Sequence, residues 1–173
     1  MKKIIIEFFI FITLPLQVLS NEPKLQSVIN GLDSPWSISF VDENKALVTE
    51  KSGNLILVDF ITKKIKKINH NLNILEDGQG GLLEVLYFED KVFVSYSENL
   101  KNGNSSTSVA LAKFSENALN FKNIFRADPP INSGYHFGSR LVIKDNLLYV
   151  TVGERGKGMI AQDPTKHPGS IIR

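Results

Sequence analysis

One histidine stands in a short stretch that is crowded with glycine and aromatic residues. In residues 133–142, SGYHFGSRLV, His136 lies between Tyr135 and Phe137 with a glycine on either side. Imidazole has an ordinary pKa of about 6.5, so a positioned histidine can accept a proton from a substrate hydroxyl near neutral pH. A single loop histidine is more often structural or merely exposed. Both interpretations of His136 are open at this point.

A second glycine-rich stretch contains a glutamine in a comparable place. Residues 76–85, EDGQGGLLEV, set Gln79 in a tight turn before a β-rich run, and its amide offers both a donor and an acceptor. The stretch is no phosphate loop, because no Lys-Ser/Thr pair follows and a strand comes next. If the fold is a propeller, Gln79 and His136 both precede the innermost strand of a sheet, so they converge on one mouth of the central channel.

A third stretch, residues 150–164, carries two adjacent charges in a glycine-rich turn. Glu154 and Arg155 either orient a site or pair with each other at the surface, and their spacing favours neither alternative. The remaining histidines, His70 and His167, are expected to be structural. Because the histidines form no HxH or HxxxH pattern, the sequence predicts no metal site.

The elements that must position these residues are predicted to be strands. Short β-rich runs bounded by Gly, Asp, Asn and Ser recur, and no segment keeps a 3.6-residue apolar period. Four consecutive antiparallel strands are predicted by WSISF, ALVTE, NLILVDF and KIKKI, at residues 36–40, 46–50, 54–60 and 64–68. The lysine-rich fourth run is typical of a solvated outer strand.

The same pattern returns at residues 81–98 and 139–154. Aligning the second strand of each unit brings Val48, Val94 and Val150 into register, each followed by a hydroxyl residue. The spacings are 46 and 56 residues, which is typical of β-propeller blades of four short strands. The longer second spacing is attributed to two loops, a polar one at residues 97–107 and a connection between blades at residues 126–135.

The predicted fold class is therefore all-β, a partial β-propeller arc of about two and a half to three blades. Propellers generally close with four to eight blades, and an open arc exposes the apolar flanks of its terminal blades. The chain is accordingly expected to be a fragment, a truncated reading frame or one partner of a larger assembly.

The first residues have the layout of a secretory signal peptide. Residues 1–20 combine Lys2 and Lys3 with an apolar run of nine at residues 8–16, which is too short to span a bilayer. The prediction is a signal peptide at residues 1–20, a propeller portion at 21–173, and a periplasmic or secreted protein with no membrane span after the leader is removed.

Composition excludes some partners and one kind of stabilisation. Without the charged residues of the leader, 18 basic and 17 acidic residues nearly balance, so no long-range attraction for nucleic acid is expected. The chain has no cysteine. Export would therefore bring no disulfide framework, and burial of apolar surface must hold the fold.

Four ordered motifs resemble the glucose/sorbosone dehydrogenase family, the soluble aldose sugar dehydrogenases that depend on pyrroloquinoline quinone (PQQ). They are GLDSPWSISFVDENKALVTEKSGNLILV, DGQGGLLEV, SGYHFGSRLVIKDNLLYVTVGERG and AQDPTKHPGSIIR, and the match as a whole covers nearly all of residues 28–173, in the family order. The resemblance implies a six-bladed propeller with the quinone over the central channel. It also implies that sugar C1 gives a hydride to the quinone and that an external acceptor takes the electrons.

The resemblance assigns roles residue by residue. His136 matches the catalytic histidine that takes the hydroxyl proton, and Gln79 matches a glutamine that faces the aldose. Tyr135 stands where glucose-specific members carry an aspartate, so a broader aldose specificity is implied, and Ser170 stands where members usually carry a lysine. The ligands of the quinone and of calcium come from the second half of the family's proteins, so the isolated chain is expected to be inactive. The alternative is a non-catalytic propeller module that binds a carbohydrate or a protein, because fold does not fix function.

Overall fold

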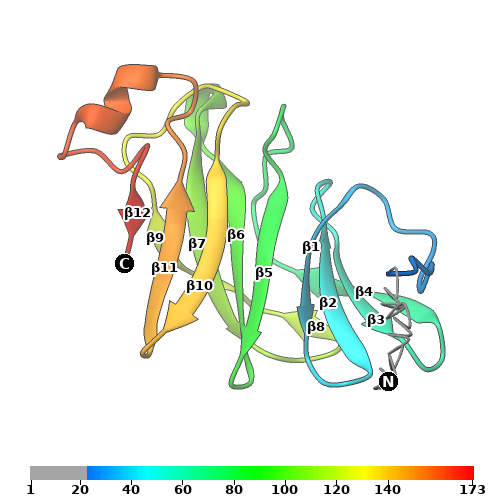
Figure 1. Cartoon of the computed structure of the whole chain (residues 1–173). Helices are drawn as coiled ribbons and strands as arrows, with labels where there is room; N and C mark the ends of the chain where they lie inside the picture. The colour runs from blue at the N-terminus through cyan, green and yellow to red at the C-terminus, as the bar shows by residue number, and fades with distance from the viewer. Residues whose placement is uncertain (1–22) are drawn as a thin grey trace, which may run out of the picture.

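Three sheets stand side by side in the computed structural model, which describes residues 23–173 (Figure 1). The first sheet contains β1 (Pro35–Phe40), β2 (Lys45–Glu50), β3 (Leu55–Asp59), β4 (Lys64–His70) and the short β8 (Ala118–Leu119). The second contains β5 (Leu82–Phe88), β6 (Lys91–Asn99), β7 (Ser105–Lys113) and β9 (Lys122–Arg126). The third contains β10 (Gly138–Lys144), β11 (Leu147–Val152) and β12 (Ile171–Ile172).

Short 3₁₀ turns interrupt the strands in two places, η1 (Lys101–Gly103) and η2 (Gly158–Gln162). No helix within residues 23–173 is long and apolar enough to cross a membrane. The all-β arc of three sheets confirms the predicted fold class. The leader prediction falls on residues 1–20, which lie outside the described part of the chain.

Tight hairpins join the first two strands of the second and third sheets. Glu89 and Asp90 have φ angles of 48° and 59°, and Asp145 and Asn146 have 52° and 59°. Two consecutive left-handed residues match a turn whose twist suits antiparallel strands, and short Asp and Asn side chains tolerate that conformation. These are the acidic turns that the repeat pattern predicts between its paired apolar runs.

The registers confirm the repeat. Each aligned valine pairs with the first strand of its own sheet: Val48 with Ile38, Val94 with Val85, and Val150 with Leu141. A hydrophobic cluster that includes Leu47 and Val85 fills the seam between the first two sheets, and one that includes Val109 and Leu141 fills the next seam. Burial across these two seams holds the arc together.

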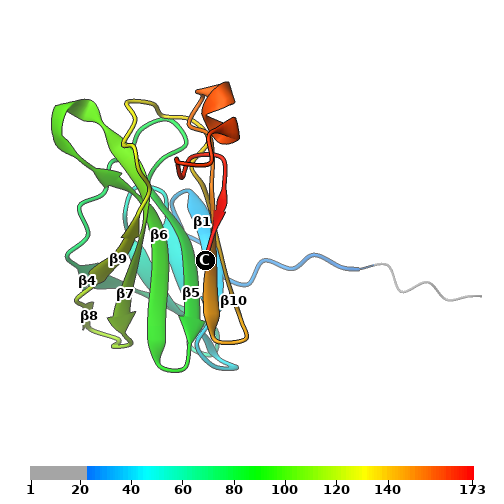
Figure 2. The ribbon, with the colours of Figure 1, turned by 90° about the vertical axis from the view of Figure 1, so that its left-hand side faces the viewer.

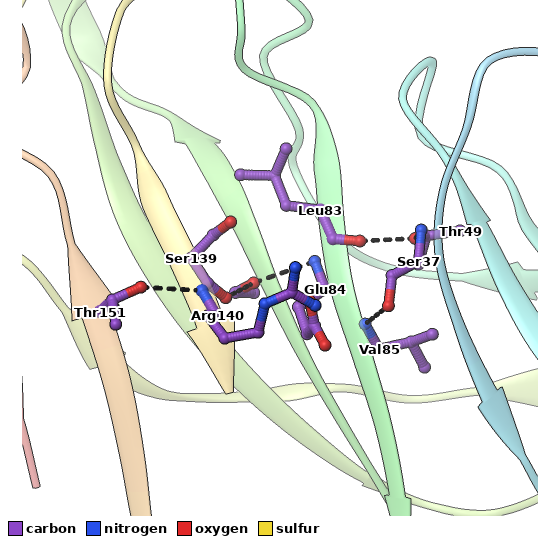
Figure 3. A network of polar contacts seen from close by, with 9 residues as sticks. Ser37, Thr49, Leu83, Glu84, Val85, Ser139, Arg140 and Thr151 are labelled. Carbon is purple, nitrogen blue, oxygen red and sulfur yellow. Dashed lines mark hydrogen bonds and ion pairs between the residues drawn. The ribbon is translucent and has the colours of Figure 1, made fainter. Parts of the chain in front are cut away.

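A hydroxyl residue follows each aligned valine, and two of the three hydroxyls link neighbouring sheets (Figure 3). Within its own sheet, each hydroxyl accepts a backbone N–H of the first strand: Thr49 from Ser37 at 3.2 Å, Ser95 from Glu84 at 3.1 Å, and Thr151 from Arg140 at 3.0 Å. Thr49 then donates to the carbonyl of Leu83 in the second sheet, and Ser95 donates to that of Ser139 in the third at 2.6 Å. We call this arrangement the hydroxyl relay.

Two features differ from the sequence prediction. Residues 97–107, predicted as a polar loop, mostly extend β6 and β7, whose ladder runs to the pair Asn99 and Ser105. The prediction is wrong because several of these polar side chains are buried and hydrogen-bonded: Thr107, for example, donates to the carbonyl of Phe137 at 2.7 Å. In addition, the chain leaves the second sheet between β7 and β9, and there β8 pairs parallel with β4 of the first sheet. No local sequence pattern indicates this pairing.

The remaining connections follow the prediction. Residues 127–137 join the second sheet to the third, as expected for a link between blades. Residues 64–67 of β4 are exposed, as expected for a solvated outer strand. Before β1, residues 23–34 form no strand, and Figure 2 shows the beginning of this segment running away from the sheets.

Candidate active site

Three loops from two sheets meet at one end of the strands. They are residues 76–81 before β5, residues 133–138 at the start of β10, and residues 153–158 after β11. The first and second are joined by the Gln79 backbone N–H, which donates to the carbonyl of Gly134 at 2.7 Å. Two of the loops lead into the first strand of a sheet, and the third follows the second strand of the third sheet. Packing of the two sheets therefore brings the three loops together.

Glycine permits the close approach of these loops. A Cβ atom at Gly78 would lie 2.4 Å from the carbonyl oxygen of Gly134, and one at Gly153 would lie 1.9 Å from that of His136. Neither distance is compatible with a side chain. The glycines that the sequence sets around Gln79 and His136 therefore let two backbones touch where the candidate site lies.

His136 and Gln79, which are 57 residues apart, are hydrogen-bonded. The backbone N–H of His136 donates to Gln79 Oε1 at 2.9 Å, and His136 itself has a φ of 48°. The Tyr135 ring is exposed, with its centroid 6.0 Å from that of the imidazole. The structure thus brings Gln79, Tyr135 and His136, the three residues predicted for the site, to one place. Their roles remain predictions.

The imidazole of His136 also contacts a carboxylate. Glu154 Oε1 lies against His136 Nδ1 and also accepts the backbone N–H of Gly156 at 3.1 Å. The hydrogen bond with His136 is the main cause that lowers the pKa of Glu154 below its ordinary value. An ionised Glu154 requires Nδ1 to carry a proton, which leaves Nε2 as the acceptor of the ring.

Arg155 turns the other way, into the interior, and is only 2% exposed. Its N–H groups donate to the carbonyls of Ser105, Ile131, Ser133 and Tyr135 and to Ser105 Oγ. The guanidinium also stacks 3.7 Å from the ring centroid of Phe137. Burial lowers the pKa of Arg155 to about 10, so it remains charged at neutral pH.

The two alternatives that the sequence left open for Glu154 and Arg155 are now resolved. They do not pair with each other at the surface, because one contacts His136 and the other is buried among carbonyls. Sequence reasoning could not identify the interior role of Arg155. Its only signal was a charge within a glycine turn, and the direction of the side chain depends on the neighbouring sheet.

The other histidines make backbone contacts. His70 Nε2 lies 2.7 Å from the carbonyl oxygen of Gly53, and His167 Nδ1 accepts the backbone N–H of Asp128 at 2.9 Å. These contacts agree with the structural role expected for them. Within residues 23–173 no group of three His, Asp or Glu side chains is placed to hold a metal ion.

The charges of the three loops do not suit a tricarboxylate cofactor such as PQQ. The loops carry three carboxylates (Glu76, Asp77 and Glu154) and two cations (Arg155 and Lys157). Of the two cations, Arg155 is already engaged with five acceptors. A site for several carboxylates needs free cations and N–H donors. The loops offer the imidazole of His136 as a proton acceptor, and they do not form a cradle for several carboxylates.

Fold and site together define a β-propeller portion whose strand ends carry a histidine–carboxylate pair. Residues 32–173 match the family described as Glucose / Sorbosone dehydrogenase, and the chain belongs to that family. It is 30% identical over 152 residues to aldose sugar dehydrogenase YliI of Escherichia coli (strain K12), covering 82% of this chain and 41% of that protein.

Solved structures of related proteins have a similar fold. A crystal structure of a glucose dehydrogenase matches with a TM-score of 0.82 and 32% identity, covering 87% of this chain and 47% of that one. The soluble aldose sugar dehydrogenase of Escherichia coli, solved in its apo form, matches with a TM-score of 0.79 and 29% identity over 85% and 45% of the two chains. The chain thus spans less than half the length of these relatives.

Proposed function

We propose that this chain forms the proton-accepting part of a PQQ-dependent aldose dehydrogenase, which oxidises an aldose at C1 to the lactone. The observation that carries the proposal is the placement of His136. Its Nδ1 is held by Glu154 and its backbone by Gln79, while about half of the side chain is open to solvent. Family membership supports the aldose substrate and the class of oxidoreductase.

The residues of this chain would handle the proton. Oxidation of the C1 hydroxyl removes one proton and one hydride, and His136 Nε2 takes the proton. Glu154 stabilises the imidazolium that forms, because its carboxylate already lies against Nδ1. Gln79 fixes the backbone of His136, and the exposed Tyr135 ring forms one wall beside the imidazole, where the sugar would lie.

When bound, the quinone would accept the hydride, and its electrons would pass to an external acceptor. Its carboxylates, and a calcium ion beside it, would be held by residues other than the three loops, as the family resemblance implies. We expect the 173-residue chain by itself to show no turnover with PQQ, calcium and a dye acceptor. We further propose that residues 1–20 act as a signal peptide and that the propeller portion, 21–173, works in the periplasm or outside the cell.

The test is a chimera in which residues 28–173 replace the matching segment of the Escherichia coli aldose sugar dehydrogenase. Reconstituted with PQQ and calcium, it should oxidise aldoses in a dye-coupled assay. His136→Gln should lower kcat by roughly 10²–10⁴-fold, the usual contribution of a general base, and leave quinone binding unchanged. His70→Gln is the matched control, because its imidazole contacts the Gly53 carbonyl. If the chimera that carries His136→Gln binds the quinone and keeps full turnover, the role proposed for His136 is wrong.

A further inference from the structure

The backbone of His136 has a conformation that few residues other than glycine adopt. Its φ of 48° lies in the left-handed region. A residue keeps such a conformation only where the surrounding contacts fix it. The side chain of Gln79 supplies one of these contacts, at the backbone N–H of His136. The residues on either side of His136 must be held by other groups.

One buried side chain makes contacts on both sides of His136. The guanidinium of Arg155 donates through Nε to the carbonyl of Tyr135 at 3.0 Å. Its Nη2 donates to the carbonyl of Ser133. The same guanidinium stacks 3.7 Å from the ring centroid of Phe137. Arg155 therefore contacts the residue directly before His136 and the residue directly after it.

The remaining bonds of the guanidinium include two that anchor it to the second sheet. Nη1 of Arg155 donates to the carbonyl of Ser105 at 3.0 Å, and Nη2 donates to Ser105 Oγ at 2.9 Å. Ser105 is the first residue of β7, is 1% exposed, and pairs in register with Asn99 of β6. A group held by a buried strand is placed more precisely than one held by a loop. The loop that carries His136 is thus tied to a fixed point of the neighbouring sheet.

Arg155 also fixes the residue whose carboxylate contacts the imidazole. Glu154 directly precedes Arg155 in the chain, and the backbone N–H of Arg155 donates to the carbonyl of His136 at 3.4 Å. Burial of the guanidinium therefore restrains the backbone from which the Glu154 carboxylate reaches Nδ1 of the ring. Both members of the histidine–carboxylate pair depend on the same buried side chain.

We propose that Arg155 is a positioning residue, which holds the loop on both sides of His136 and so keeps the imidazole against Glu154. It acts through His136, because its own N–H groups are engaged with four carbonyls and one hydroxyl. The effect on turnover rests on the proposed function. The effect on the contact between His136 and Glu154 does not.

The contact can be measured in this chain without sugar or quinone. Titration of the Glu154 carboxyl by carbon NMR, assigned with Glu154→Gln, reports it, because the hydrogen bond with His136 is the main cause that lowers the pKa of Glu154. Arg155→Lys keeps the positive charge but loses the planar fork, so it should raise the pKa of Glu154 toward its ordinary value. Ser105→Ala is a milder change that removes one acceptor of the guanidinium, and it should shift this pKa in the same direction.

Arg126→Lys is the matched control for this measurement. Arg126 Nε donates to the buried carboxylate of Glu98 within the second sheet at 2.7 Å, so its replacement should leave the pKa of Glu154 unchanged. Circular dichroism confirms folding of each variant. An unchanged pKa of Glu154 in Arg155→Lys and Ser105→Ala, or an equal rise in Arg126→Lys, would overturn the proposal. A rise in Arg155→Met but not in Arg155→Lys would assign the effect to charge, and the positioning role would be wrong.

Turnover of the chimera described above gives a second, independent readout. A residue that acts through His136 should matter only while His136 is present. Arg155→Lys should lower kcat by roughly 10–10²-fold, as small displacements of a catalytic group do, but by less than about twofold in the His136→Gln background. If kcat falls by the same factor in both backgrounds, the positioning role is wrong and the proposed function stands. If His136→Gln keeps full turnover, the proposed function is wrong, and the pKa of Glu154 alone decides the role of Arg155.

Discussion

Replacement of Arg155 by methionine tests how the loops of the candidate site are held. The side chain is buried, and its guanidinium donates to four carbonyls and one hydroxyl. Hydrogen bonds to a charged group contribute about 1.5–3 kcal/mol each, but they are not additive. Burial of the guanidinium opposes them, as the lowered pKa of about 10 shows. The expected net loss of unfolding free energy is about 3–5 kcal/mol, as for other broken buried charge networks.

Urea unfolding followed by circular dichroism measures this loss as a lower midpoint concentration of urea, with no change in the denaturant dependence (m) of the unfolding free energy. Arg155→Lys should be intermediate, because it keeps the charge but loses the planar fork that reaches several acceptors. Lys113→Met is the control: its ammonium lies 3.7 Å from Asp90 at an exposed site, and such pairs contribute about 0–1 kcal/mol. If Arg155→Met loses no more stability than Lys113→Met, the interior role assigned to Arg155 is wrong.

Three further predictions concern the loops and the relay. Gly153→Ala should destabilise the protein and increase amide exchange of residues 133–138, since the new Cβ would lie 1.9 Å from the His136 carbonyl oxygen. Thr49→Val should cost about 1–3 kcal/mol in urea unfolding, because the buried Leu83 carbonyl loses its donor. The lowered pKa of Glu154 means that its contact stabilises the fold above pH 4.5 and is lost as pH falls through the folded-state pKa, so the stability deficit of Glu154→Gln should vanish in acid.

Each of these predictions has a control. Gly158→Ala adds a Cβ that meets nothing within 4 Å at a φ of 48°, so it measures backbone strain without a clash, whereas Gly153→Ala measures the clash. Glu76→Gln removes a carboxylate from the same group of loops, but not the one that contacts His136, so it is the control for the loss of a charge. Equal behaviour of Glu76→Gln and Glu154→Gln between pH 7 and pH 3 would contradict the assigned contact.

The strands and the repeat could be predicted because their signals are local. Period-two apolar runs and Asp or Asn turns depend on neighbours within a few residues. The alignment of Val48, Val94 and Val150 then fixed the register, and the structure confirms it. Placing Gln79 and His136 at one mouth required only that both precede the first strand of a sheet.

The rest could not be predicted because it depends on what another sheet presents. The polar residues 97–107 predict a loop, but the buried Thr107 donates to the carbonyl of Phe137, directly before the third sheet. The direction of Arg155 depends on the carbonyls of Ser105 and of the connection between the sheets. Polarity alone cannot distinguish a solvated loop from a strand whose hydroxyls are satisfied by a neighbour.

The position of His136 also depends on how two neighbouring sheets pack against each other. His136 is fixed through its backbone by Gln79, in the loop before the second sheet, and through its ring by Glu154, in the loop after β11 of the third. Any shift of one sheet along the other would separate these two contacts. The apolar seam and the Ser95 link to Ser139 oppose such a shift. Substitutions in that seam should therefore disturb His136 although they contact none of its atoms.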